Sequence, residues 1–581
     1  MEIFKKKTKD LTNFDTSKLS NFHFGKADAQ SDEVLTHCFQ NINGVSEFLS
    51  GAKNIVLGER GAGKSALFKL ISEDKIQFTS KKSSQRKDLI VPIEDDLNYI
   101  SIAQAVDTRF TGKSVKTHSR YRFLWELYIL DRIIKCLEDV NIDKDSEFDG
   151  LKKDIGKALG INHDKKSFFD TLKNLKVTAA TKYDSVTNTI TPSVSVEPSV
   201  NTQLKGVEIS DTEIASISSR LRKFIHKKTD FVVIVLIDKI DDFVVGIEYE
   251  EQLKNIQALV ECANDYRFPE IKVKLFLRSD LFNRLDFERI GYDKIYSQTT
   301  TLEWSKEDIC EFVARRLVYN FIENEIPVNL NINFHSLDLD SELKSQLLSL
   351  SQNNENGLTE AVKKITERFK LKLKINWAIF NKTSHTARKT NLSQEISLKI
   401  TTKIFPRRTY HFSLGCKKEL LNLDDFFASH FKFGSDHPNP RLMLMFLNKV
   451  FELANRYYYK NSDLRMLSEN SEHEYELILN DHINEAYQSI QNSSRKTIAN
   501  LNSNWKRYIE HFFSTLEEPI KCSGFTIEDI KQRIQCDFDE NELRRFIAFF
   551  SHAGLFIPEN PHVSLESRKF GLPLLLKICP Q

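Results

Sequence analysis

The sequence predicts an α/β fold in which a parallel sheet is covered by helices on both faces. Four short apolar runs have the length and composition of buried strands, and helical patterns such as 251–266 lie between them. Apolar strands that alternate with helices are typical of parallel sheets whose two faces are both buried. The four predicted strands are 54–57, 89–93, 231–237 and 273–277.

Composition and charge exclude several classes of protein. Hydrophobic residues make up 40% and charged residues 28% of the 581, which is ordinary for a globular chain of several domains. The longest apolar run, 231–237, is far shorter than the ~20 residues of a membrane-spanning helix, and no apolar core of a secretory signal follows the first lysines. We therefore expect a cytoplasmic protein without a membrane segment. The net charge of +2 argues neither for nor against nucleic acid, and the eight cysteines form no closely spaced pair for zinc.

A glycine-rich motif carries the strongest functional signal. Residues 58–65 read Gly-Glu-Arg-Gly-Ala-Gly-Lys-Ser and satisfy G-x-x-x-x-G-K-[ST] between a predicted strand and a predicted helix. Such a loop turns backbone N–H groups toward a phosphate, and the helix adds its positive end. We expect Lys64 to neutralise the β- and γ-phosphates of ATP and Ser65 to bind Mg²⁺. The expected nucleotide-binding residues of the loop are Gly58, Gly61, Ala62, Gly63, Lys64, Ser65 and Ala66.

Phosphoryl transfer also requires carboxylates, one in the Mg²⁺ shell and one that orients the attacking water. The strand 231–237 ends in Asp238, which we assign to the metal. Many ATPases of this kind place Glu directly after that Asp, whereas this chain has Lys239. The water-orienting role then falls to Asp241 or Asp242, and slow turnover becomes an alternative to fast hydrolysis.

Two arginines are candidates for contacting the phosphates. Arg278 follows the strand 273–277, where an Arg can sense the γ-phosphate and stabilise charge in the transition state. A structural salt bridge to Asp280 or Asp286 is the alternative for this residue. Arg441 lies in the first turn of an apolar helix, from which it could reach the phosphates as part of a lid, or it is an ordinary surface residue.

These motifs resemble those of bacterial P-loop ATPases of the additional-strand (ASCE) division, near the KAP, STAND and AAA-type NTPases. The stretches that carry the resemblance read GERGAGKS, VIVLIDKIDDF, LFLRSDLF, LEWSKEDICEFVARRL and HPNPRLMLMFLNKVFELA. Within that division the chain is similar to stand-alone bacterial ATPases linked to DNA repair and phage defence. The resemblance covers about 22–70, 225–320 and 405–450, and the Arg after the fourth strand matches at Arg278.

The resemblance implies further roles for individual residues. A D-x-x-D pair follows the strand in that family, and this chain matches it at Asp238 and Asp241. The family also has an N-terminal segment similar to residues 21–28, which implies that these residues lie over the adenine or brace the P-loop. No arginine finger matches residue by residue, and Arg315 and Arg316 are candidates by position only.

The sequence predicts five parts. Within the second part, the tract 177–201 is rich in Ser, Thr, Val and Pro, which predicts a loop, an exposed β-hairpin or a disordered segment. The parts are an N-terminal segment (1–50), an ATPase core (51–320) with a helical insertion (about 97–225), a basic insertion (321–430), a helical lid region (431–505) and a winged-helix-like domain (506–581).

The segment 361–408 is strongly basic, with thirteen Lys or Arg residues against two Glu. Its alternating stretch 369–375 predicts a strand with all its lysines on one face, close to Trp377 and Phe380. This pattern fits a ribbon that follows nucleic-acid phosphates, and it fits equally an edge strand whose lysines prevent aggregation. The lysines are Lys370, Lys372 and Lys374.

The C-terminal helices favour a packing or protein-contact module over a DNA reader. The second helix of the predicted winged helix opens with Asp539, Glu540 and Glu542, where phosphate contacts are normally made. Only Arg544 and Arg545 favour DNA there.

Two functions remain open at this point. The first is a Mg²⁺-dependent ATPase that acts as a homo-oligomeric machine in bacterial antiviral defence or DNA maintenance, with nucleic acid or a separate effector protein as partner. The second is an ATP-binding switch or scaffold with little turnover that controls a partner protein. No nuclease or protease motif is present in the sequence, so a destructive activity would come from that partner.

Overall fold

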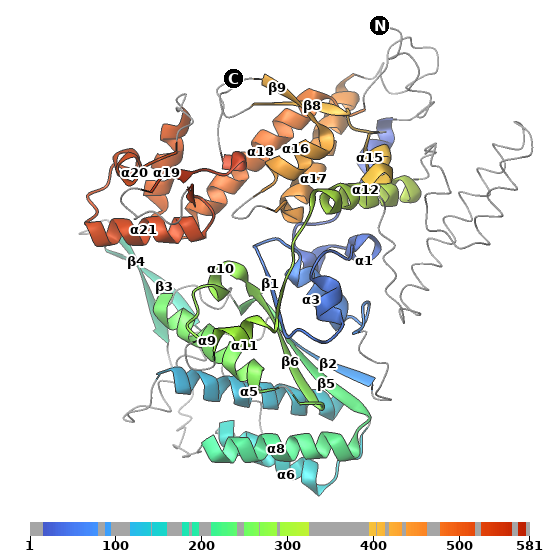
Figure 1. Cartoon of the computed structure of the whole chain (residues 1–581), viewed down its shortest axis with the longest axis vertical. Helices are drawn as coiled ribbons and strands as arrows, with labels where there is room; N and C mark the ends of the chain where they lie inside the picture. The colour runs from blue at the N-terminus through green and yellow to red at the C-terminus, as the bar shows by residue number, and fades with distance from the viewer. Residues whose placement is uncertain are drawn as a thin grey trace, which may run out of the picture. The chain divides into compact units, whose positions relative to one another are not determined.

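The structure is a computed structural model, and the residues that it describes fall into two compact units (Figure 1). The sheet unit comprises Glu47–Leu57 and Leu67–Thr301, and the helical unit comprises Met1–Ser46, Gly58–Ala66 and Leu302–Gln581. The described residues are 16–78, 87–94, 117–140, 142–159, 177–184, 189–196, 211–240, 249–266, 268–287, 291–324, 394–402, 404–412, 418–432, 437–461, 477–502, 504–517, 524–559 and 568–576.

A five-stranded sheet organises the sheet unit, with the strand order β2-β5-β6-β1-β7. The pairs β2–β5, β5–β6 and β1–β7 are parallel, and Leu275 N of β6 donates to Asn54 O at the start of β1. Pro92 lies on the edge strand β2, where a missing N–H costs no inner ladder bond. The strands are β1 Ile55–Gly58, β2 Lys87–Ile93, β5 Phe231–Ile237, β6 Ile271–Arg278 and β7 Thr299–Thr301.

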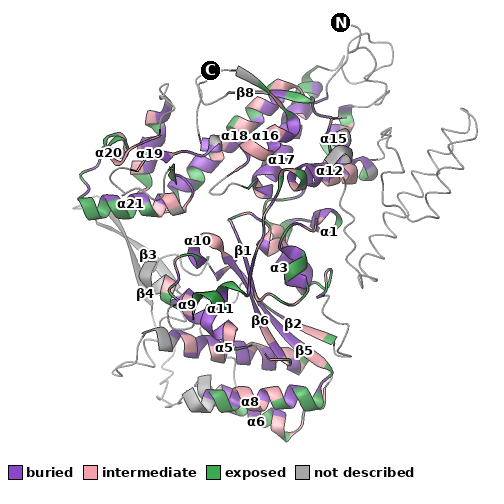
Figure 2. Cartoon of the chain, viewed as in Figure 1, coloured by how far each residue is buried: buried purple, intermediate pink, exposed green. Residues whose placement is uncertain are grey.

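Both faces of this sheet are buried, which confirms the α/β prediction. Side chains of β6 alternate between two environments, as the two-residue period of a strand requires. One set joins a core with α5 (Thr117–Asp139) and α9 (Tyr249–Asp265), whose buried residues are purple in Figure 2. On the other face Phe276 makes edge contacts with Phe48 and Phe68. The first set is Ile271, Val273, Leu275 and Leu277.

A buried lysine, Lys274, lies on the Phe276 face of the same strand. Its side chain is 0% exposed, its Nζ donates to Lys53 O and to Asn54 Oδ1 (3.3 Å), and the ammonium lies 4.9 Å from the ring centroid of Phe48. Burial lowers the pKa of Lys274 to about 7, with a further lowering from the charge of Lys272. The sheet therefore holds an amine whose charge is disfavoured in the folded state.

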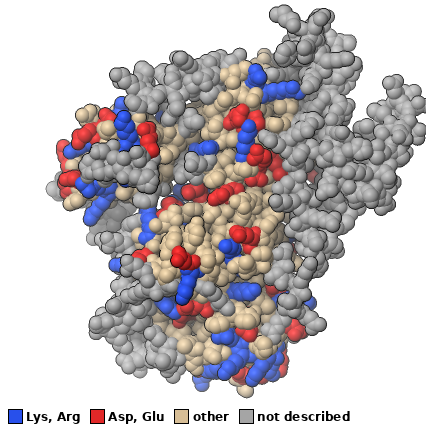
Figure 3. All heavy atoms as spheres, in the orientation of Figure 1, with Lys and Arg blue, Asp and Glu red and all other residues tan. Residues whose placement is uncertain are grey.

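Between β2 and β5 the chain adds α6 (Ser146–Leu159), α8 (Asp211–Lys228) and the antiparallel hairpin of β3 (Val177–Asp184) and β4 (Thr189–Val196). The hairpin was one of the three alternatives for the tract 177–201. Basic residues of α8 pair with acidic residues near α6, as in Lys228 with Asp143 and Asp145. On the face drawn in Figure 3, Lys and Arg side chains are mixed with Asp and Glu side chains.

The helical unit is built on α17 (Pro440–Lys460), which packs against α18 (Asn480–Ala499) and the 3-10 helix η1 (Thr16–Asn21). Eleven residues of α17 are buried, because its apolar positions recur at helical spacing. The same unit contains α1 Leu35–Cys38, η2 Ala29–Ser31, α12 Lys306–Glu323, α15 Gln394–Thr401, the antiparallel pair β8 Arg408–Phe412 and β9 Lys418–Asn422, and α16 Leu423–His430.

The last helices share one apolar cluster that includes Ile530, Phe546 and Phe556. Two predicted helices are present, and each begins at a side-chain cap, Thr526 for one and Asp539 for the other. The order helix, helix, small antiparallel pair agrees with the predicted pattern, while the winged-helix assignment remains a prediction. The elements are α19 Lys506–Ser514, η6 Thr515–Glu517, α20 Ile527–Ile534, α21 Glu540–His552, β10 Ile557–Pro558, β11 Phe570–Gly571 and η8 Leu574–Leu576.

The sequence missed β7 and the β8–β9 hairpin, since runs such as Thr299–Thr301 have little apolar content. The five-part division stays a prediction. Within the described part of the chain, no helix combines the length and the apolar character that a membrane span requires.

We predict that Lys274 makes the stability of the chain depend on pH above neutrality. The unfolded chain keeps this amine charged up to its ordinary pKa of about 10.5, whereas the folded chain releases the proton at about pH 7. Folding therefore costs a deprotonation that becomes easier as pH rises through this window. The difference in melting temperature between Lys274→Met and the wild type should fall between pH 7 and pH 10. A constant difference over that range would contradict a lowered pKa.

Candidate functional site

The glycine-rich loop leaves the sheet at the end of β1 and enters α3 (Lys64–Ser72), so the predicted order of strand, loop and helix is present. Lys64 is 9% exposed, and its Nζ donates to Gly58 O at 2.7 Å and to Glu59 O at 3.0 Å. These bonds hold the ammonium against the loop backbone. The loop thus presents a cation at the start of a helix, where anions are favoured.

Two glycines of the loop are required for different reasons. Gly61 has φ of 88° and Gly63 has φ of 102°, a region that side chains with a Cβ rarely adopt. A Cβ on Gly61 would also lie 2.6 Å from Asn439 Oδ1 and 2.9 Å from Arg441 Cβ. A Cβ on Gly63 would meet nothing within 4 Å. Gly61 therefore permits the close approach of α17, while Gly63 serves the backbone turn alone.

Side chains from two other segments hold carbonyl groups of the loop. Trp304 Nε1 donates to Ala62 O at 2.9 Å, and Asn439 Nδ2 donates to Arg60 O at 2.7 Å. Trp304 and Asn439 are both buried, so these bonds are protected from water. The two donors fix the orientation of two peptide groups of the loop, those that follow Arg60 and Ala62.

Asn439 has a second task as the N-cap of α17. Its Oδ1 accepts from Arg441 N at 3.0 Å and from Leu442 N at 3.4 Å, and Pro440 occupies the first helical position. One side-chain amide therefore caps the first turn of α17 and also bonds the helix to the loop.

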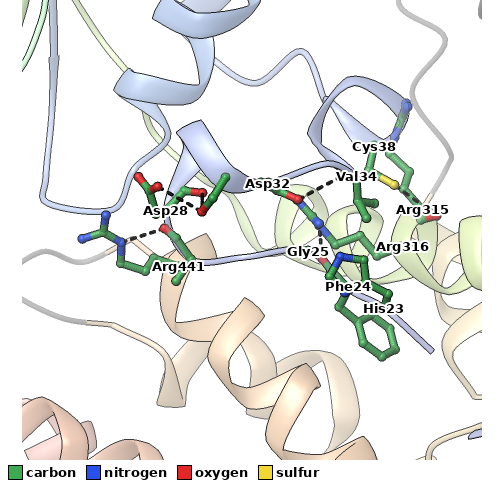
Figure 4. Close-up of polar contacts among 12 residues, drawn as sticks. His23, Phe24, Gly25, Asp28, Asp32, Val34, Cys38, Arg315, Arg316 and Arg441 are labelled. Atoms are coloured by element: carbon green, nitrogen blue, oxygen red, sulfur yellow. Dashed lines mark hydrogen bonds and ion pairs between the residues drawn. The ribbon is translucent and has the colours of Figure 1, made fainter. Parts of the chain in front are cut away.

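Arg441 lies beside the loop, as the packing of its Cβ near Gly61 indicates. Its Nε donates to Ala27 O at 3.2 Å, in the segment 21–28 (Figure 4). Arg441 is the second residue of α17 and lies in its first turn. Its contact with a phosphate stays a prediction.

The segment 21–28 is held at several points by α12 and α17. Asn320 pairs with the backbone of His23, accepting from its N at 2.6 Å and donating to its O at 3.0 Å. Asn448 Nδ2 donates to Gly25 O at 2.9 Å. Together with the bond from Arg441 to Ala27 O, these contacts tie the segment to α12 and to α17, the helix whose N-cap Asn439 bonds to the loop. The two roles that the family resemblance implies for this segment, bracing the P-loop or lying over the adenine, both stay predictions.

Arg316 and Asp32 form a buried ion pair behind the same segment (Figure 4). Arg316 is 2% exposed, its Nη2 lies 3.1 Å from Asp32 Oδ2, and its Nη1 donates to Phe24 O. Such a guanidinium cannot reach another subunit, so Arg316 does not fit the role of an arginine finger. Arg315 is paired with Glu311 at 2.6 Å on its own helix.

In the sheet unit, Asp238 follows β5 directly and is 2% exposed. Its N–H donates to Ile93 O at 3.1 Å, so the residue continues the ladder with β2. Lys239 has φ of 59°, in the left-handed region, and its Nζ lies 3.6 Å from Glu94 Oε2. A left-handed residue other than glycine is uncommon and is often retained at functional sites.

Arg278 is the last residue of β6, the strand that pairs with β5. Its guanidinium forms two hydrogen bonds with Asp280, Nε to Oδ1 at 3.0 Å and Nη2 to Oδ2 at 2.8 Å. The salt-bridge alternative is therefore present in this structure. A role on the γ-phosphate stays a prediction and requires Arg278 to exchange this partner.

Several predicted residues lie outside the described part of the chain. Asp241 and Asp242 are among them, as are the lysines 370, 372 and 374 and most of the basic segment 361–408. The described residues contain no group of three or more His, Cys, Asp or Glu side chains that could hold a metal. One hydroxyl and one carboxylate suit Mg²⁺, which keeps several waters and takes further oxygens from phosphates. Ser65, in the first turn of α3, has an oxygen of the first kind, and the buried Asp238 has oxygens of the second.

Sequence reasoning missed Trp304 and the loop contact of Asn439. An Asn before Pro at the start of an apolar helix does signal an N-cap, but no pattern shows what the other end of the amide holds. The buried pair of Arg316 and Asp32 joins residues 284 positions apart and has no local signal.

The fold and the loop define the class: the chain is an α/β protein with a P-loop motif at the end of an inner strand of a parallel sheet. No family model matches the sequence. A relative is the putative transposon gamma-delta 80.3 kDa protein of Escherichia coli (strain K12), 23% identical over 315 residues. The match covers 51% of this chain and 40% of the relative, so the chain spans less than half of that protein's length.

Two solved structures align with most of the chain at low similarity. Cdc6p from Pyrobaculum aerophilum aligns over 97% of this chain and 96% of its own, with 9% identity and a TM-score of 0.25. The Drosophila ORC bound to DNA aligns over 91% of this chain and 82% of its own, with 10% identity and a TM-score of 0.24. Superpositions at these scores carry no argument, so the class rests on the sheet and the loop of this chain.

We predict that Asn439→Ala weakens binding of Mg·ATP and lowers the melting temperature. The variant loses the cap of α17, worth about 1 kcal/mol, and the bond that holds Arg60 O. Asn422→Ala is the matched control, because Asn422 also precedes a helix but makes no side-chain cap bond. Calorimetric titration with Mg·ATP and thermal melts of both variants give the comparison. Equal affinities for Asn439→Ala, Asn422→Ala and the wild type would show that the loop does not depend on this amide.

Proposed function

We propose that the chain binds Mg·ATP at the loop 58–65 and hydrolyses it. The observation that carries the proposal is the complete G-x-x-x-x-G-K-S motif at the end of an inner strand, with its backbone fixed by Trp304 and Asn439. A loop held in one conformation before the ligand arrives loses little entropy on binding. Lys64, already buried against the loop, supplies the positive charge for the β- and γ-phosphates.

The remaining chemistry is assigned to the carboxyl edge of the sheet. Ser65 and Asp238 would hold Mg²⁺, which would neutralise charge on the phosphates and orient them for attack by water. A carboxylate at this edge would orient the attacking water, and Asp241 and Asp242 are the candidates that the sequence predicts. Once its guanidinium has released Asp280, Arg278 would stabilise the charge that develops on the γ-phosphate.

A second candidate is an ATP-dependent switch or scaffold with little turnover. Two observations favour it: Lys239 stands where many ATPases have Glu, and Arg278 is held by both oxygens of Asp280. In this case ATP would stabilise one state of the protein by binding alone.

The partners are proposed from charge and from the family resemblance. The basic segment 361–408 would contact nucleic-acid phosphates, and a homo-oligomer or an effector protein would receive the nucleotide signal. The roles in DNA maintenance and in antiviral defence both rest on the family resemblance alone.

Lys64→Ala should abolish Mg·ATP binding, because it removes the cation that meets the phosphates. Lys75→Ala, on the exposed turn after α3, should bind normally and serves as the control. Asp238→Asn should weaken only the Mg²⁺-dependent part of the affinity. Calorimetric titrations with and without Mg²⁺ check both expectations, and turnover with and without duplex or single-stranded DNA separates ATPase from switch. Unchanged affinity in Lys64→Ala would overturn the site.

A further inference from the structure

Glu94 lies next to Asp238 at the carboxyl edge of the sheet. The strands β2 and β5 are parallel and in register, with Ile93 opposite Ile237, and Asp238 N donates to Ile93 O at 3.1 Å. The next residue of each strand is therefore Glu94 on one side and Asp238 on the other. Adjacent strands are about 4.8 Å apart, a distance that a Glu side chain can span.

Lys239 links these two positions. Its left-handed backbone, with φ of 59°, turns the chain directly after Asp238, and its ammonium lies 3.6 Å from Glu94 Oε2. The side chains of Glu94 and Lys239 are 25% and 23% exposed, so both are partly screened from water but reachable by it. The ion pair fixes the Glu94 carboxylate on the side of the sheet edge where Asp238 lies.

We propose that Glu94 is the general base of ATP hydrolysis and that Lys239 positions it. The inference rests on the proposed function, because it assigns the water-activating carboxylate of that same site. The carboxylate that many ATPases place after the metal-binding Asp comes here from the neighbouring strand. Lys239 occupies the position that this Glu has in those ATPases, and it holds the carboxylate of Glu94, which takes the place of that Glu.

The reaction that this assigns is a simple displacement. The Glu94 carboxylate accepts a proton from water while the water oxygen forms a bond to the γ-phosphorus. The bond from that phosphorus to the bridging oxygen breaks, and its electron pair leaves with ADP. Glu94 then returns the proton to solvent, so that ATP and water become ADP, phosphate and a proton.

The test compares Glu94→Gln with Asp241→Asn and Asp242→Asn in the full chain. Glu94→Gln should bind Mg·ATP with wild-type affinity and hydrolyse it roughly 10²–10⁴-fold more slowly, the usual contribution of general base catalysis. Glu73→Gln, an exposed Glu paired with Lys69 at 3.9 Å, is the matched control and should keep full activity. Lys239→Gln should lower kcat by a smaller factor and leave KM unchanged, since it only positions the base.

The outcomes distinguish this inference from the proposed function. Titration with Mg·ATP tests the binding site. If the wild type does not bind Mg·ATP, the proposed function and the role of Glu94 are both overturned. A wild type that binds ATP without hydrolysing it leaves the binding site intact and overturns the role of Glu94. Near-normal turnover in Glu94→Gln, with loss in Asp241→Asn or Asp242→Asn, assigns the base to the later carboxylates and also overturns it. Retained affinity in Glu94→Gln shows that the variant is folded.

Discussion

The geometry of the candidate site depends on the hydrogen bonds of the Asn439 side-chain amide. Its oxygen caps α17 and its nitrogen holds Arg60 O, so a single buried group sets both the start of the helix and the path of the loop. Gly61 makes this possible, because any larger residue would collide with Asn439. A buried amide whose oxygen and nitrogen both form hydrogen bonds is costly to replace, because losing either bond leaves a buried polar group without a hydrogen-bond partner.

The N-terminal segment extends this constraint into the rest of the helical unit. Arg441, two residues after the cap, holds Ala27 O, and Asn448 on the same helix holds Gly25 O. Behind the segment, the pair of Arg316 and Asp32 is almost fully buried, and breaking such a pair from one side typically costs about 3–5 kcal/mol. The loop, the segment and two helices therefore form one connected set of polar contacts.

The sheet unit contributes a different constraint, the common edge at which parallel strands end. This arrangement brings Glu94, Asp238 and Arg278 to one side of the sheet from three separate strands. Glu94 is paired there with Lys239, and Arg278 is paired with Asp280. In the proposed chemistry Arg278 exchanges Asp280 for a phosphate, whereas Lys239 keeps Glu94 in place.

The sequence by itself determined the class of fold and the position of the loop. Apolar runs such as Phe231–Ile237 need both faces of a sheet buried, and the spacing of Gly58 to Ser65 is a local property of eight adjacent residues. It also placed Asp238 and Arg278 at strand ends, because a strand that ends in a polar residue shows in the pattern. Only the tertiary structure showed that Trp304 and Asn439 hold the loop, that Arg316 is buried against Asp32, and that Glu94 lies beside Asp238. Each of these pairs joins residues far apart in the chain, and such contacts are decided by how the elements pack and by the register of the sheet, which no local pattern of residues contains.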